Sequence, residues 1–86
     1  MDKRKLKNRI VRRLERLRSE LSQTIVDKQW WNNNRLDAPP FDIGWDLMMR
    51  DLTTKELAAW AADDFDAARA LSQEAMQLFE NGRTVG

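Results

Sequence analysis

Side chains that commonly carry out catalysis are scarce in this sequence of 86 residues. It contains no histidine, cysteine or tyrosine. The commonest general base, the thiolate nucleophile and the imidazole ligands of metal ions are therefore missing. The serines, Ser19, Ser22 and Ser72, fall within predicted helices and have no evident base nearby. Any catalysis would have to depend on carboxylates.

Carboxylates cluster at two places in the sequence. Asp63, Asp64 and Asp66 could hold a divalent cation, but the glycine turn and distal glutamate of a calcium loop are absent. Helix capping explains these three residues better. Asp42 and Asp46 lie one helical turn apart, as a pair of acid–base carboxylates would. We predict that neither cluster is a site, and that the protein is not an enzyme and uses no metal or cofactor.

Arginines form the clearest pattern that could bind a partner. They occupy one broad side of a predicted helix at spacings of three, one and three residues: Arg9, Arg12, Arg13 and Arg16. With Lys5, they could follow a phosphate backbone. However, Asn8 is the one base-reading side chain on this face, and no aromatic residue interleaves the arginines. Nucleic acid is therefore the second choice, after an acidic protein partner, and a solvated face is the remaining alternative.

Charge is distributed unevenly along the chain. Residues 1–18 contain nine Lys and Arg against two acidic residues, a net charge of +7, whereas residues 19–86 carry −6. Such polarity predicts either a basic arm that binds a partner or a charge match within the protein. We expect the acidic segments, of the same chain or of a second copy, to pack near the basic residues.

Tryptophan is abundant, with four in the chain. Trp45 and Trp60 fall on the inner faces of predicted helices and are expected in the core. Trp30 and Trp31 are consecutive, so they point about 100° apart on a helix and one should be partly exposed. Exposed tryptophan beside arginine is typical of protein-binding hot spots, although a lid over the end of a helical hairpin is the alternative. The predicted partner contacts are Arg9, Arg12, Arg13, Arg16, Trp30, Trp31 and Arg35.

The predicted partner contacts must be positioned by helices. The first predicted helix is long and basic and covers residues 2–30. Its aliphatic residues recur every three or four positions, which is the helical period: Leu6, Ile10, Leu14, Leu17, Leu21 and Ile25. We call these six residues the aliphatic stripe. Its length predicts a helical hairpin or a dimer seam, but Thr24 interrupts the heptad pattern of a regular coiled coil.

The next elements are predicted from turn and capping residues. Three asparagines and two prolines indicate an ordered loop over 32–40. A short helix over 43–51, capped by Asp42, would bury a face made by Phe41, Trp45, Met48 and Leu52.

A capping box at Thr53 and Glu56 predicts that a helical segment over 54–81 begins there. Asn81 and Gly82 would end this segment and leave a tail over 82–86. Its predicted inner face consists of Leu57, Trp60, Ala61, Phe65, Ala68, Leu71, Ala75, Leu78 and Phe79.

The segment over 54–81 is either one helix or two joined by a bend near 62–64, because Asp63 or Asp64 could cap a fresh helix. The run from Trp60 to Leu71 resembles the bend and second helix of a tetratricopeptide-type unit. The usual glycine at the bend is missing, and the chain has no repeat of about 34 residues. The resemblance implies a bend and nothing more, and we favour the bend.

The sequence thus predicts one all-α domain over residues 1–86. In it, the long basic N-terminal helix forms a hairpin against a C-terminal helix, with a short helix packed across one end. Its core is thin at this length. We expect a non-enzymatic interaction protein that binds and modulates or inhibits a protein partner and forms a homodimer. Small proteins of this profile are often regulators or inhibitors, and a phage or mobile element is one source of them, an association with a class of proteins that no single residue carries. No run resembles a membrane span or a secretory signal, which predicts a cytoplasmic protein.

Overall fold

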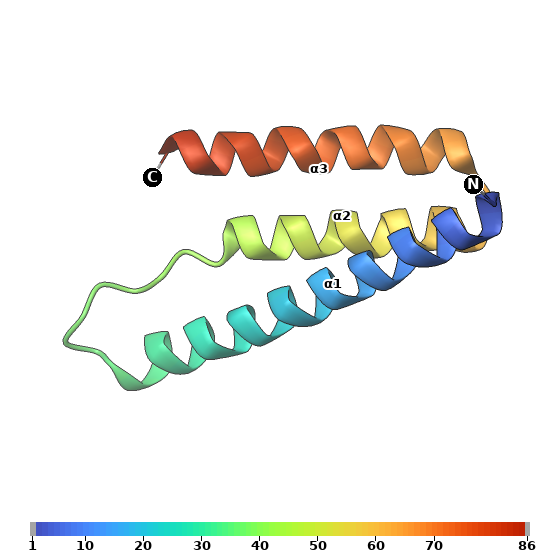
Figure 1. Ribbon diagram of the computed structural model, residues 1–86. Helices are drawn as coiled ribbons and strands as arrows, with labels where there is room; N and C mark the ends of the chain where they lie inside the picture. The colour runs from blue at the N-terminus through green and yellow to red at the C-terminus, as the bar shows by residue number, and fades with distance from the viewer. Residues whose placement is uncertain (1, 86) are drawn as a thin grey trace.

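Three antiparallel helices make up the protein, in a computed structural model that describes residues 2–85 and the side chains of residues 2–81. They are α1 (Lys3–Asn34), α2 (Gly44–Ala61) and α3 (Phe65–Val85). α2 lies between the other two and packs against both (Figure 1). Residues 2–85 contain no strand, and none of their helices has the length and apolarity needed to cross a bilayer. The predicted all-α hairpin with a bend is confirmed.

α1 is longer than predicted, and the loop after it is displaced. Asp2 caps the helix by accepting a hydrogen bond from the Arg4 amide at 3.0 Å, as an N-cap aspartate does. The predicted end near residue 30 is wrong, because the helix continues to Asn34 and the loop covers 35–43. Asn34 donates to the Trp30 carbonyl one turn back, and Asn32 binds the backbone of Phe41. Asn34 bonds a carbonyl of its own helix and Asn32 is used by the loop, so neither side chain ends the helix.

The predicted start of a helix at Thr53 is also wrong. The Thr53 and Thr54 hydroxyls donate to the carbonyls of Met49 and Arg50, at 2.8 and 3.0 Å, within one continuous helix. A threonine that bonds the carbonyl one turn earlier leaves the helical backbone intact. The predicted short helix over 43–51 and the beginning of the segment over 54–81 therefore merge into α2.

α2 begins at Gly44 with Ile43 at the N-cap position, which has no side-chain cap hydrogen bond, so the prediction that Asp42 caps this helix is wrong. The Asp42 carboxylate accepts a hydrogen bond from the Gly44 amide at 2.8 Å. A Cβ atom at position 44 would lie 3.1 Å from that carboxylate oxygen, which is tighter than about nine in ten such contacts, so the Asp42 side chain would have to shift. Glycine is therefore favoured here by the close approach of the side chain that precedes it.

The bend between α2 and α3 occurs at residues 62–64, as predicted. Asp63 has a φ of +57°, and the Asp64 amide donates to the Ala59 carbonyl at 2.9 Å, which closes the end of α2. Aspartate tolerates this left-handed conformation better than most residues and takes the place of the usual glycine. Asp64 then accepts a hydrogen bond from the Ala67 amide and caps α3. α3 continues past the predicted stop at Asn81 and Gly82, so the predicted tail is helical up to Val85.

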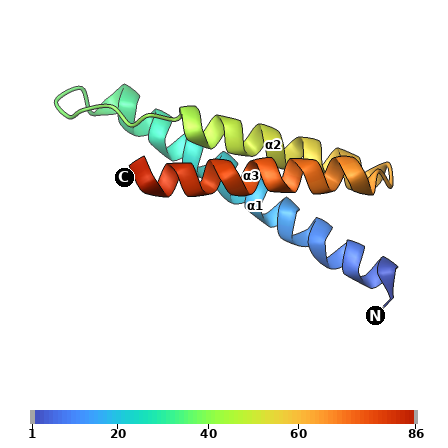
Figure 2. The ribbon, with the colours of Figure 1, turned by 90° about the horizontal axis from the view of Figure 1, so that it is seen from above.

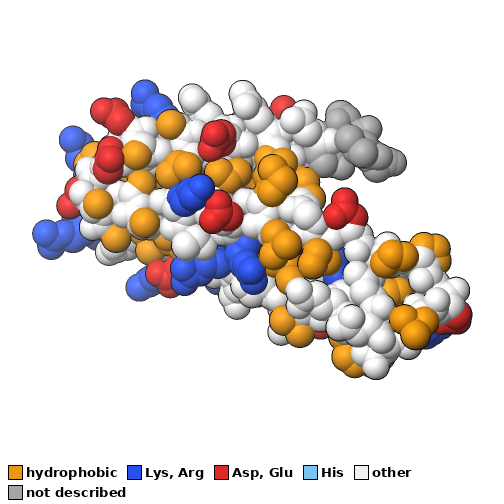
Figure 3. All heavy atoms as spheres, turned by 180° about the vertical axis from the view of Figure 1, so that it is seen from behind, with side chains coloured by type: hydrophobic (Ala, Val, Ile, Leu, Met, Phe, Trp, Pro, Cys, Tyr) orange, Lys and Arg blue, Asp and Glu red, His pale blue; other side chains and the backbone are white. Residues whose placement is uncertain are grey.

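The core is thin and partly polar. Its buried residues are Leu21, Ile25, Met49, Ala59 and Ala68, together with Asp46, Thr53 and Glu56. Several predicted inner positions are exposed instead, namely Phe41, Met48, Ala61, Phe65 and Phe79. Trp45 and Trp60 are half-buried. Hydrophobic side chains consequently reach the surface along the seam between α2 and α3 (Figure 3). The prediction was wrong for these five positions, whereas Ala68 is buried and Leu57, Leu71 and Leu78 are half-buried, as predicted. On α2 the buried positions include the polar residues Asp46, Thr53 and Glu56.

Glu56 shows the energetic consequence of this polar core. Burial raises the pKa of its carboxyl group, which the hydrogen bond from Trp60 Nε1 at 3.4 Å opposes only in part. If folding raises the pKa of a carboxyl group, protonation of that group stabilises the folded state, and this stabilisation is fully present at pH values below the ordinary pKa. That stabilisation is lost as the pH rises through the raised pKa. Ionised Glu56 therefore weakens the fold at neutral pH.

We expect Glu56→Gln to raise the melting temperature at pH 7, and to lose this advantage as the pH falls toward the ordinary pKa of glutamate. Glutamine keeps an oxygen for the Trp60 hydrogen bond and carries no charge. The measurement is thermal unfolding followed by circular dichroism at several pH values. Glu20→Gln, at an exposed position on α1, serves as the control with no such pH-dependent difference. An equal response of both variants would contradict the burial argument.

Candidate functional site

The four predicted arginines lie together on the outer side of α1. With two neighbours they line a shallow, open hollow of about 480 Å³, formed by Lys5, Asn8, Arg9, Arg12, Arg13 and Arg16. We call these six residues the arginine surface. All six side chains are exposed. Their helical positions lie roughly opposite the aliphatic stripe, which faces the rest of the protein.

The arginine surface keeps its positive charge. None of its arginines forms an ion pair with an acidic group among the described residues; the ion pairs of α1 outside it are Lys7–Asp63 at 2.6 Å and Lys28–Asp46 at 2.8 Å. The expected pairing of basic residues of α1 with acidic residues of the same chain therefore occurs at Lys7 and Lys28. It does not occur at the arginine surface. Five like charges within three helical turns repel one another, by a few tenths of a kcal/mol for each pair one turn apart. An anionic partner would relieve that repulsion.

Trp30 is the exposed tryptophan of the consecutive pair, with 60% of its surface accessible. It follows Arg16 by fourteen residues, just under four helical turns, so it lies on the same side of α1 as the arginine surface. The two features are about 21 Å apart along the helix axis. Val26, one turn before Trp30, is also exposed and extends the apolar spot. The outer side of α1 therefore carries a cationic half and an apolar half.

Trp31 and Arg35 occupy a different environment. The Arg35 guanidinium lies 4.8 Å from the centre of the Trp31 ring, and the ring of Phe41 meets Trp31 edge-on at 5.8 Å. Arg35 also lies 3.5 Å from the Asp37 carboxylate. These two predicted contact residues are thus joined to each other and to the loop over 35–43, and they stand apart from the arginine surface.

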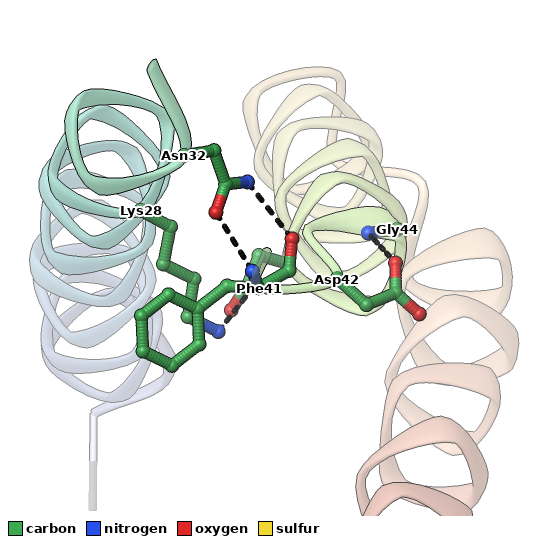
Figure 4. A network of polar contacts seen from close by, with 6 residues as sticks. Lys28, Asn32, Phe41, Asp42 and Gly44 are labelled. Carbon is green, nitrogen blue, oxygen red and sulfur yellow. Dashed lines mark hydrogen bonds and ion pairs between the residues drawn. The ribbon is translucent and has the colours of Figure 1, made fainter. Parts of the chain in front are cut away.

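A polar clamp fixes this loop to α1 (Figure 4). The Asn32 side chain accepts from the Phe41 amide at 2.7 Å and donates to the Phe41 carbonyl at 2.9 Å. Lys28 lies beneath the Phe41 ring at 5.9 Å and binds the buried carboxylate of Asp46. No local sequence pattern predicts this clamp, because its members are separated by up to eighteen residues.

The two candidate carboxylate clusters are engaged in structural contacts. The Asp42 carboxylate accepts a hydrogen bond from the Gly44 amide, whereas the Asp46 carboxylate binds Lys28, so the two carboxylates have separate partners. Asp63 pairs with Lys7, and Asp64 caps α3. No group of three or more carboxylates among residues 2–81 is arranged to hold a metal ion.

Comparison with known proteins adds no further information about this surface. No protein-family model matches the sequence, and neither the search of curated proteins nor the search of solved structures gives a match.

Proposed function

We propose that this protein is a non-enzymatic binding protein that modulates or inhibits a protein partner by docking an acidic surface onto the outer side of α1. The observation that carries the proposal is the arginine surface, whose four arginines are exposed and have no ion-pair partner among the described residues. Guanidinium groups bind carboxylates through two parallel hydrogen bonds, which gives both charge and geometric selectivity.

Trp30 supports a protein partner specifically. Trp30 is 60% exposed, and a protein partner that covered it would bury a large aromatic side chain at the centre of the interface. Binding of single-stranded nucleic acid would instead use aromatic rings placed among the cations. Trp31 and Arg35 contact each other, and Trp31 also contacts Phe41. We therefore propose that these two residues stabilise the end of α1 and contact the partner less than Trp30 does. The absence of an enzymatic role rests on the missing histidine, cysteine and tyrosine and on the structural engagement of the clustered aspartates.

A nucleic acid remains the second candidate, and one observation favours it. Lys5, Arg9, Arg12 and Arg16 form a ladder over about 17 Å of helix, and such a ladder can contact successive phosphates. A phosphate-contacting surface of this kind loses affinity steeply as salt concentration rises. The two candidates therefore differ in their response to salt.

The test is a fluorescence-anisotropy titration with three labelled probes: a helical peptide with glutamates one turn apart, duplex DNA and duplex RNA. Each is measured at low and at near-physiological salt. We expect the peptide to bind, and Arg9→Ala/Arg12→Ala/Arg16→Ala to weaken it at least tenfold, or about 1.4 kcal/mol. The matched control is Arg50→Ala/Lys55→Ala/Arg69→Ala, which removes the same charge elsewhere and should bind normally.

Three outcomes would change the assignment. Equal losses in the two triple variants would mean that net charge alone is responsible and would overturn the site. DNA or RNA binding that survives near-physiological salt and vanishes in the surface variant would favour nucleic acid. Capture from cell extract then tests Trp30: a partner retained by the native chain and lost with Trp30→Ala supports the proposal, and retention by Trp30→Ala removes Trp30 from the site.

A further inference from the structure

The protein exposes more surface than a monomer of its size should. Its accessible area is 6832 Å², whereas a compact monomer of this length exposes about 5,300 Å². Its radius of gyration is 15.3 Å, compared with about 12 Å for a compact domain. If two copies each buried an excess of about 1,500 Å², their interface would total about 3,000 Å², within the range of obligate homodimers.

Part of the excess lies on the N-terminal half of α1. This half diverges sideways from α2 and α3 (Figure 2). The aliphatic stripe is accordingly covered unevenly: Leu21 and Ile25 are buried, Leu14 and Leu17 are half-buried, and Leu6 is 44% exposed. The N-terminal half of α1 therefore exposes aliphatic side chains that no other element of the same chain covers fully.

A second apolar strip runs along one edge of α3. Phe65, Met76 and Phe79 lie on this edge, where Arg69 and Ser72 occupy the positions between Phe65 and Met76. All three apolar residues are exposed. The rings of Trp60 and Trp45 contact Phe65 and Phe79 at 5.6 and 6.2 Å between centres, which positions both phenylalanines but leaves much of their surface accessible. Met76, between them, is 61% exposed.

The charges that accompany these two strips are opposite. Outside the arginine surface, residues 1–18 hold four Lys and Arg against two acidic residues, a net charge of +2, whereas residues 63–80 hold five acidic residues against Arg69 alone. Lys7 and Asp63 already pair at 2.6 Å where the two regions approach within one chain. A two-fold axis would place the N-terminal half of α1 of each copy against the edge of α3 of the other copy. The same contact would then form twice.

We propose that a second copy of this chain covers both strips, with the N-terminal half of α1 of each copy lying against the Phe65–Met76–Phe79 edge of α3 of the other. The cations beside the stripe, Lys3 and Arg18 among them, face the acidic residues of the partner copy. The arginine surface lies on the opposite side of α1 and stays open. This homodimer is therefore independent of the function proposed above.

The first test is the mass of the full chain in solution, measured by sedimentation from submicromolar to high micromolar concentration. We expect a dimer whose dissociation constant rises at least tenfold in Leu6→Asp and in Met76→Asp, because each places a charge in the apolar contact. The matched control is Met48→Asp, at a methionine of α2 that is 57% exposed and belongs to neither strip. This control should dimerise as the native chain does.

The second test identifies the contact between α1 and α3 by reversing its charges. Lys3→Glu/Arg18→Glu and Asp66→Lys/Glu80→Lys should each dimerise poorly, because both contacts then join like charges. An equimolar mixture should form the heterodimer, since one contact is reversed on both sides and the other is native. A chain that is monomeric throughout, a dimer insensitive to both Asp variants, or a mixture without heterodimer would overturn the proposal. The triple variant of the arginine surface should dimerise normally, which separates this test from the earlier one.

Discussion

Replacing Ile25 by aspartate is expected to abolish the cooperative fold. Ile25 is 3% exposed and lies where the aliphatic stripe is covered completely. The substitution removes apolar burial worth about 2 kcal/mol and adds a buried carboxylate that has no cation, which costs several kcal/mol more. A chain of this length has a free energy of unfolding of about 5–10 kcal/mol. The variant should show no unfolding transition in urea when followed by circular dichroism.

The same change at the other end of the stripe is the control. Leu6→Asp places an identical charge at a position that is 44% exposed. It should alter the unfolding of the monomer by less than about 1 kcal/mol when measured at low protein concentration. Ile25→Val, which keeps the position apolar, should cost about 1 kcal/mol. A native urea midpoint for Ile25→Asp would show that α1 does not pack through this stripe.

Removing the ammonium group of Lys28, which pairs with Asp46, is expected to cause the second large loss of stability. The Asp46 side chain is 5% exposed and its carboxylate lies 2.8 Å from Lys28 Nζ. Lys28→Met leaves this buried carboxylate without its cation, and breaking a buried pair in this way costs about 3 kcal/mol or more. The Phe41 ring also loses the ammonium group beneath it, so the loop over 35–43 should become more mobile.

The reverse truncation should be milder. Asp46→Asn leaves Lys28, whose side chain is 29% exposed and can turn its ammonium group toward water. The double variant Lys28→Met/Asp46→Asn should recover much of the stability that Lys28→Met loses, because no buried charge remains. The measurement is a double-mutant cycle from urea unfolding. Equal, small losses for the two single variants would contradict the view that Asp46 is the desolvated member of the pair.

Local sequence patterns determined much of this fold. The three- and four-residue spacing of the aliphatic stripe predicts α1 from its own residues alone. The aspartates at 63 and 64 predict the bend, because a short polar side chain both tolerates a left-handed backbone and caps the following helix. The arginine surface follows from the same helical geometry, since residues three and four apart share a side.

Tertiary structure decided where the helices end. Asn32 and Thr53 are both residues that local rules assign to turns or caps, and both lie inside helices here. Asn32 is used by the backbone of Phe41, nine residues away, and the Thr53 hydroxyl bonds a carbonyl one turn earlier. A polar side chain interrupts a helix only if the backbone competes for it, and that depends on the other partners available.

Tertiary structure also decided which faces are covered. Leu6 and Ile25 belong to one stripe but differ greatly in exposure, because α1 diverges from α2 toward its N-terminus. Trp30 and Trp31 are adjacent, yet only Trp31 meets Phe41 and Arg35. Helical period fixes the direction in which a side chain leaves its own helix. What it meets there depends on the angle at which the neighbouring helices cross, and that angle is set by contacts between residues far apart in the sequence.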